Sequence, residues 1–168
     1  MQRIFILLLI SFASVGSLLA CTPGNLPFSE GFNNGTMPAC WTTQPVSGNS
    51  VPFVTSTTMP NSSNVIVPEG SHFLYWQNYD YAGNGASVRL VSPAVSTLGL
   101  KNIKLNFKWL HRNFAASSQD AVIVQVSSNG TSWINLQTIN RAIASDYSTN
   151  WANYEIALPA SFENLSVV

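Results

Sequence analysis

The chain has 168 residues, of which only 8% are charged; seven are basic and seven acidic, so the formal net charge at pH 7 is zero. This balance excludes the basic stripe by which nucleic-acid-binding domains hold phosphates, and it excludes a polybasic membrane patch. Few charges combined with 11% aromatic residues favour an exported β protein over a cytosolic enzyme.

The first 20 residues have the pattern of a secretory signal peptide. Arg3 supplies the charged start, Ile4–Ile10 is a short apolar run, and small residues follow as far as Ala20. The apolar run is too short for a typical membrane span, and no later segment is long enough to cross a membrane. We therefore expect residues 1–20 to be removed on export, leaving residues 21–168 as one secreted or surface-exposed domain.

Cys21 and Cys40 are the only cysteines of the chain. Two cysteines in an exported protein favour one disulfide. The alternative is a lipoprotein: Leu18–Cys21 is an imperfect lipobox, and lipidation of Cys21 would leave Cys40 as a free thiol beside Trp41. A metal site is disfavoured, because two cysteines without a nearby histidine cannot complete a tetrahedral ligand set.

The N-terminal half is expected to begin with a strand around Glu30, followed by a turn at Asn33–Gly35. Ser47–Asn64 is rich in Ser, Thr and Pro, and we expect it to form a surface loop. Period-two patterns predict the later strands, which in chain order are Gly70–Asn78, Ala86–Val91, Ile103–Trp109, Asp120–Val126, Trp133–Ile139 and Asn153–Leu158.

Two of these segments carry further information about their place in a sheet. In Ile103–Trp109 apolar and polar residues alternate strictly, which predicts one buried face and one solvated face. Asp120–Val126 is β-branched and apolar on both faces, which predicts a central strand. Asn129–Gly130 follows it and predicts a hairpin turn.

Short strands, frequent turns and no helical period predict an all-β fold, an antiparallel sandwich or jelly roll. Leu165–Val168 resembles the start of a strand with nothing after it. We therefore expect the domain to lack its last strand or strands.

No catalytic motif stands out in the sequence. The closest pair of acidic residues is Glu155 and Glu163, without the spacing of a glycosidase carboxylate pair. Gly70-Ser71-His72 lacks the second glycine of a nucleophile elbow. We expect a protein that is not an enzyme; a jelly-roll hydrolase with scattered carboxylates is the enzymatic alternative.

Aromatic residues crowd the stretch FLYWQNYDY, which begins at Phe73. Aromatic rings stack on sugars and polar groups bind their hydroxyls, so this stretch is a candidate for carbohydrate binding. Alternate residues of Phe73–Trp76 are also explained as core. Tyr79, Asp80 and Tyr81 approach a glycine-rich loop and are the candidate ligand-binding residues.

Glu30 and Asp120 are candidate ligands of a Ca²⁺ ion, which prefers hard oxygen donors. Each stands at the edge of an expected strand, so neighbouring strands would bring the two carboxylates together. Solvated acids or caps are the alternative interpretation.

Several motifs together resemble a known family. They are Leu26–Phe32, Met37–Trp41, Leu90–Pro93, the Leu105–Trp109 strand and Asp120. In their order and spacing these motifs resemble the cleaved-adhesin domains of Bacteroidetes surface proteins, which are related in layout to MAM-type jelly rolls. The resemblance covers essentially the whole mature chain.

The resemblance implies a non-catalytic jelly-roll adhesion domain, displayed or secreted, that recognises a host protein or glycan and is often part of a larger multidomain protein. It also implies a structural Ca²⁺ held by Glu30 and Asp120 and a disulfide between Cys21 and Cys40. An accessory domain of a surface protease or glycosidase, whose catalytic part lies outside this chain, is the alternative. Two departures are Asn33, where the family commonly has an acid, and the family's closing strand, which is absent after Val168.

Overall fold

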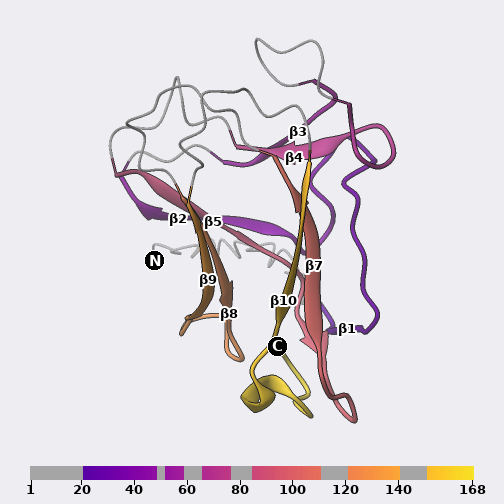
Figure 1. The fold of residues 1–168 in the computed structure, drawn as a ribbon, viewed down its shortest axis with the longest axis vertical. Coiled ribbons are helices and arrows are strands. Elements are labelled where there is room, and N and C mark those ends of the chain that lie inside the picture. The colour runs from indigo at the N-terminus through magenta and orange to yellow at the C-terminus, as the bar shows by residue number, and fades with distance from the viewer. Residues whose placement is uncertain (1–20, 49–51, 59–65, 77–84, 111–120, 141–150) are drawn as a thin grey trace, which may run out of the picture.

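The structure is a computed structural model that describes residues 21–48, 52–58, 66–76, 85–110, 121–140 and 151–168. The expected signal peptide, residues 1–20, lies outside the described residues. Within the described ranges the chain is all-β, with ten strands and one 3₁₀ turn, η1 (Ala160–Phe162). The predicted all-β class is thus confirmed (Figure 1).

The ten strands form five two-stranded ladders. The four antiparallel ladders are β2 (Thr42–Ser47) with β5 (Ser87–Val91), β3 (Val54–Ser56) with β4 (Phe73–Tyr75), β7 (Lys104–Trp109) with β10 (Ala152–Ala157), and β8 (Ala121–Val126) with β9 (Ile134–Asn140). The fifth ladder pairs β1 (Gly24–Asn25) with β6 (Val95–Ser96) in parallel.

The strands with the clearest period-two patterns lie where the sequence predicts them. β5, β7, β8, β9 and β10 match their expected segments to within one residue at nearly every end. The predicted turn also forms: the side-chain oxygen Oδ1 of Asn129 accepts the backbone N–H of Thr131 at 2.9 Å and that of Ser132 at 2.8 Å. Local turn chemistry therefore fixes the β8–β9 hairpin.

Three expectations are wrong. The segment around Glu30 is a loop between β1 and β2, because its backbone pairs with no strand among the described residues. Ser47–Asn64 contains β3, which the polar composition hides and pairing with β4 reveals. β8 is not central among the described strands: its only ladder is with β9, and Ile123 is 50% exposed.

A sandwich core forms between the β8–β9 and β7–β10 ladders. Val124 and Ile139 from the first ladder pack against Ile156 from the second, and all three side chains are buried. Phe107 and Tyr154 lie directly opposite each other on β7 and β10, with their rings stacked at 5.4 Å between centroids. Such a cross-strand aromatic pair contributes about 0.5–1 kcal/mol beyond simple burial.

A second, smaller core lies beneath the β3–β4 ladder. Phe73 and Leu110 are buried there, and the ring of Trp151 meets Phe73 edge-on at 5.6 Å between centroids. The indole N–H of Trp151 donates to the carbonyl of Ile66 at 2.8 Å. The start of β10 is thus joined to the segment that precedes β4.

The C-terminal segment docks on β6 through Thr97, whose exposure is 0%. The Thr97 hydroxyl donates to the carbonyl of Phe162 at 2.8 Å and accepts the N–H of Leu165 at 2.9 Å. Val95 and Val168 exchange both backbone hydrogen bonds, at 2.9 and 2.8 Å, which is the pattern of an antiparallel pair. The predicted extended character of Leu165–Val168 is therefore realised, with β6 lying between this segment and β1.

Thr97→Val is expected to destabilise the fold by about 1–3 kcal/mol, because the near-isosteric change leaves a buried carbonyl and a part-buried N–H without their hydroxyl partner. Urea unfolding followed by far-UV circular dichroism measures the loss. Thr42→Val, on an exposed position of β2, is the matched control and should change stability by less than about 0.5 kcal/mol. Equal stabilities for the two variants would contradict this role of Thr97.

Candidate functional site

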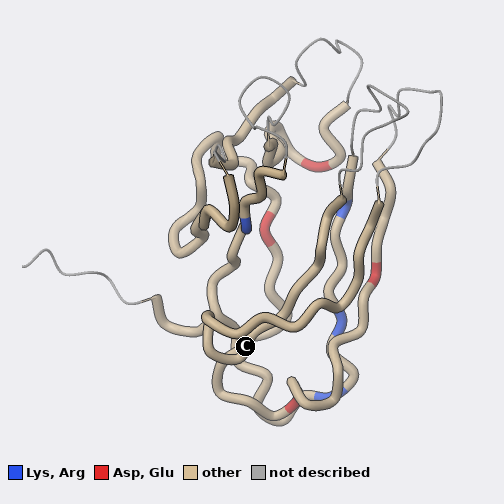
Figure 2. Tube along the Cα trace, turned by 90° about the vertical axis from the view of Figure 1, so that its left-hand side faces the viewer, with Lys and Arg blue, Asp and Glu red and all other residues tan. Residues whose placement is uncertain are grey.

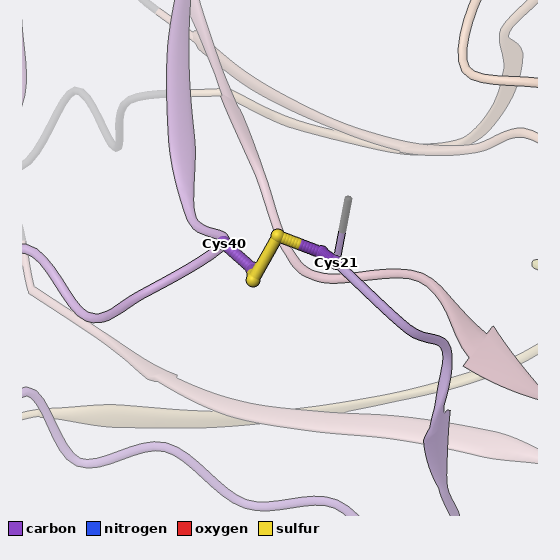
Figure 3. The surroundings of a disulfide bond; sticks show 2 residues. All are labelled: Cys21 and Cys40. Atoms are coloured by element: carbon purple, nitrogen blue, oxygen red, sulfur yellow. A yellow bond between two sulfur atoms is a disulfide. The ribbon is translucent and has the colours of Figure 1, made fainter. Parts of the chain in front are cut away.

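Cys21 and Cys40 form a disulfide, with 2.03 Å between the two sulfur atoms (Figure 3). The bond confirms the expected pairing. It also argues against the lipoprotein alternative, because a sulfur atom in a disulfide cannot carry a thioether lipid. The bridge joins the start of the described chain to the residue before Trp41, whose ring packs edge-on against Phe32 at 5.0 Å between centroids.

Glu30, the first expected Ca²⁺ ligand, lies half-buried in the loop between β1 and β2. Its carboxylate oxygen Oε1 accepts the backbone N–H of Phe32 at 2.6 Å. That bond holds Phe32 at a φ of 57°, in the left-handed region. One carboxylate oxygen of Glu30 therefore has a structural partner within its own loop.

Asn33, at the position where an acid is common in the resembled family, fastens this loop to the segment before β4. Its side-chain Oδ1 accepts the N–H of Ser71 at 3.2 Å, and its carbonyl accepts the Ser71 hydroxyl at 3.1 Å. Gly70 has a φ of 67°, and a Cβ atom on it would lie 1.8 Å from Asn33 Oδ1, so a larger residue would be strained and would displace the Asn33 side chain. The side-chain amide of Asn33 thus holds the loop between β1 and β2 against the segment before β4.

Ser71 and His72 are hydrogen-bonded, with 2.8 Å between Oγ and Nδ1. A serine activated by histidine would have to donate its proton to the ring nitrogen. Here the Ser71 hydroxyl also contacts the carbonyl of Asn33 at 3.1 Å, an acceptor that competes with His72 for its single proton. The pair has the geometry of a loop contact.

The other expected site residues, Asp120, Tyr79, Asp80 and Tyr81, lie outside the described residues. The separation of the Glu30 and Asp120 carboxylates therefore lies outside the described structure. Across the described ranges, no group of three or more His, Cys, Asp or Glu side chains is placed to hold a metal ion.

A cluster of polar and aromatic side chains surrounds Arg89, in the middle of β5, and no motif in the sequence predicts it. The Nε–H of Arg89 donates to Oε1 of Gln125 on β8 at 3.0 Å. Its guanidinium carbon lies 4.5 Å above the centre of the Trp133 ring, just before β9. We call Arg89, Gln125, Asn135 and Trp133 the Arg89 cluster.

The hydrogen-bond directions within the Arg89 cluster follow from its one obligate donor. A guanidinium can only donate, so the oxygen of the Gln125 amide must face it. The Gln125 nitrogen then donates to Oδ1 of Asn135 at 2.7 Å, which leaves the Asn135 nitrogen at the end of the network. Asn135 is exposed, so the network ends in N–H donors at the surface.

The cluster lies on the face of the β8–β9 ladder that points away from the core. Val124 and Val126, on either side of Gln125 in the strand, are both buried, so Gln125 points to the opposite face. The register of β2 with β5 places Gln44 directly opposite Arg89. Three amides, one guanidinium and one indole therefore share a small region formed by β2, β5, β8 and the start of β9.

A groove of about 360 Å³ lies at the start of β7. Leu26, Pro27 and Phe28 line one side, and Leu100, Ile103 and Lys104 line the other. Lys104 is paired with Glu155 at 2.6 Å. Lys101 also lines the groove, which therefore carries two cationic side chains.

None of the described segments forms a helix that is long and apolar enough to span a membrane. No protein-family model matches the chain, and no curated protein or solved structure shows significant similarity to it.

The disulfide is expected to be complete in the exported protein. Without reductant, neither cysteine should react with iodoacetamide; after reduction, two alkyl groups should add. Reduction should also lower the unfolding free energy by about 3 kcal/mol, since the bridge closes a loop with a sequence separation of 19. Intact-mass spectrometry measures the alkylation, and a mass increase of acyl-chain size would restore the lipoprotein interpretation.

Proposed function

We propose that this protein is an exported, non-catalytic binding domain that recognises a glycan or a host protein. The observation that supports it best is the Arg89 cluster, which presents N–H donors beside an indole ring on an outward sheet face. Sites for polar ligands combine aromatic surface with a few well-placed hydrogen-bonding groups in this way. The cluster suits reversible binding, since its groups donate hydrogen bonds and none of them is a nucleophile.

Export is supported by two features. The first 20 residues follow the signal-peptide pattern, and the Cys21–Cys40 disulfide is compatible with an oxidising, extracellular environment. The membership in the cleaved-adhesin family and the jelly-roll connectivity stay predictions. Recognition of a host protein or glycan, which that resemblance implies, agrees with the chemistry of the Arg89 cluster.

The binding function predicts saturable binding of the purified, disulfide-bonded protein to at least one glycan or host protein. A glycan array and a panel of host extracellular proteins, followed by surface plasmon resonance, provide the measurement. The heat-unfolded, reduced protein is the control for adhesion by exposed apolar surface. A folded sample that binds nothing in either panel would contradict the proposal.

We retain a structural Ca²⁺ as part of the proposal, with Glu30 and Asp120 as its acidic ligands. Ca²⁺ takes six to eight oxygen atoms. The described residues supply one of these two carboxylates, that of Glu30, and its Oε1 already accepts the Phe32 N–H. The fit therefore depends on Asp120, which immediately precedes β8 in the sequence.

Chelation with EDTA is expected to lower the melting temperature by several degrees, because an ion bound only to the folded state stabilises it by mass action. Asp120→Ala should melt at the lower temperature with or without chelator. Glu155→Gln removes an exposed acid of the β7–β10 ladder and should keep the EDTA effect. Differential scanning calorimetry provides the measurement, and a wild-type melting temperature unchanged by EDTA would rule the ion out.

A further inference from the structure

Arg89 carries a positive charge that no carboxylate neutralises within the described part of the chain. The only ion pair found there joins Lys104 to Glu155, on the β7–β10 ladder. Arg89 is half-buried in the middle of a strand, where a charge without a partner costs free energy. Charged residues are rare in this protein, as the sparse blue and red segments of Figure 2 show, so an arginine at this position requires an explanation.

The guanidinium of Arg89 is held in one orientation, and its outer edge has no partner among the residues that the structure describes. The Nε–H donates to Gln125, and the guanidinium lies over the Trp133 ring, so two independent contacts fix it. In the described ranges, the two terminal nitrogens of Arg89 donate to no protein acceptor. Their planar arrangement of N–H groups matches the two oxygens of a carboxylate.

The groups around this edge are uncharged and suit a ligand rich in hydroxyls. The nitrogen of Asn135 ends the hydrogen-bond network as a donor, and the register places the amide of Gln44 opposite Arg89. Amides both donate to and accept from hydroxyl groups. A polyanion such as nucleic acid would require several cations, and the three lysines lie instead at positions 101, 104 and 108, at the start of β7 and along it.

We propose that the Arg89 cluster binds a carboxylate-bearing sugar, a uronic or sialic acid unit of a glycan. The carboxylate pairs with the terminal nitrogens of Arg89, and the sugar hydroxyls bind the amides of Asn135 and Gln44. Gln125 is the positioning residue, because it fixes both the guanidinium and the Asn135 amide. This inference rests on the proposed binding function and narrows its ligand class.

Sialyllactose and trigalacturonate are the probes, tested by isothermal titration calorimetry on the disulfide-bonded protein. At least one should bind, and its carboxyl methyl ester should bind at least about tenfold more weakly, because the ester loses the charge-assisted hydrogen bonds and keeps the hydroxyls. Arg89→Gln should cause a similar loss. Arg89→Lys should also weaken binding, since an ammonium group cannot form the bidentate pair.

Gln125→Glu is the sharpest variant, because it places a carboxylate of nearly the same shape beside Arg89. The new carboxylate neutralises the guanidinium from its Nε side, so binding of an acidic sugar should fall at least about tenfold while the melting temperature stays equal or rises. Lys108→Gln removes one positive charge from the β7–β10 ladder and should leave binding within about twofold. This pair of variants separates a specific site from an effect of net charge and from misfolding.

Several outcomes would overturn the inference. They are failure of both acidic sugars to bind, equal binding of acid and ester, equal losses in Lys108→Gln and Arg89→Gln, and undiminished binding by Gln125→Glu. Binding of oligoglutamate at least as tight as that of the acidic sugars would assign the site to acidic peptides instead. If a neutral glycan or a host protein binds wild type and Arg89→Gln equally, the binding function stands and this site is excluded.

Discussion

The buried hydroxyl of Thr97 is the contact on which the arrangement of β1, β6 and the C-terminal segment depends. It is fully buried and binds both a carbonyl and an N–H of the C-terminal segment. β6, to which Thr97 is attached, pairs with β1 on its other side, and β1 follows closely after the disulfide. A short strand therefore fixes the N-terminal loop and the C-terminal end at once, with the hydroxyl satisfying groups that would otherwise be buried without partners.

Thr97 and a neighbouring contact also lie close to the ends of two ladders. β5 ends at Val91, four residues before β6 starts, so anchoring β6 also fixes the end of the strand that carries Arg89. On the other side, the Glu163 carboxylate accepts the N–H of Asn102 at 2.7 Å, two residues before β7. The ends of the β2–β5 and β7–β10 ladders are thus set by hydrogen bonds outside the ladders themselves.

The sequence predicts the parts of this fold that depend on local pattern. β7 follows from the strict alternation in Ile103–Trp109, and the β8–β9 hairpin follows from Asn129–Gly130, whose turn is stabilised within a few residues. β1 and β6 have only two residues each and exist because distant segments pair. No local pattern can identify such strands, and the same is true of the loop around Glu30, which Asn33 fastens to Ser71.

The candidate site was less predictable than the fold, for a related reason. The disulfide was accessible from composition, because two cysteines in an exported chain have one intramolecular pairing. Arg89, Gln125 and Asn135 are ordinary polar residues in three separate strands, and nothing in their spacing suggests a site. The informative signal was the rarity of charge. In a chain with 8% charged residues, a lone arginine within an apolar strand indicates that polar or aromatic partners lie around it in the fold.

A one-residue irregularity in the β8–β9 ladder decides whether the Arg89 cluster exists. Val124 lies opposite Gln137, and a regular ladder would then place Leu136 opposite Gln125. The register shifts at this point, Leu136 is passed over, and Asn135 lies opposite Gln125 instead. Leu136 packs against the core, and Asn135 can accept the Gln125 amide on the outward face. The bulge therefore keeps Leu136 against the core and places Asn135 beside Gln125 in a single shift. The Arg89 cluster consequently depends on the register of β8 and β9 as much as on residue identity.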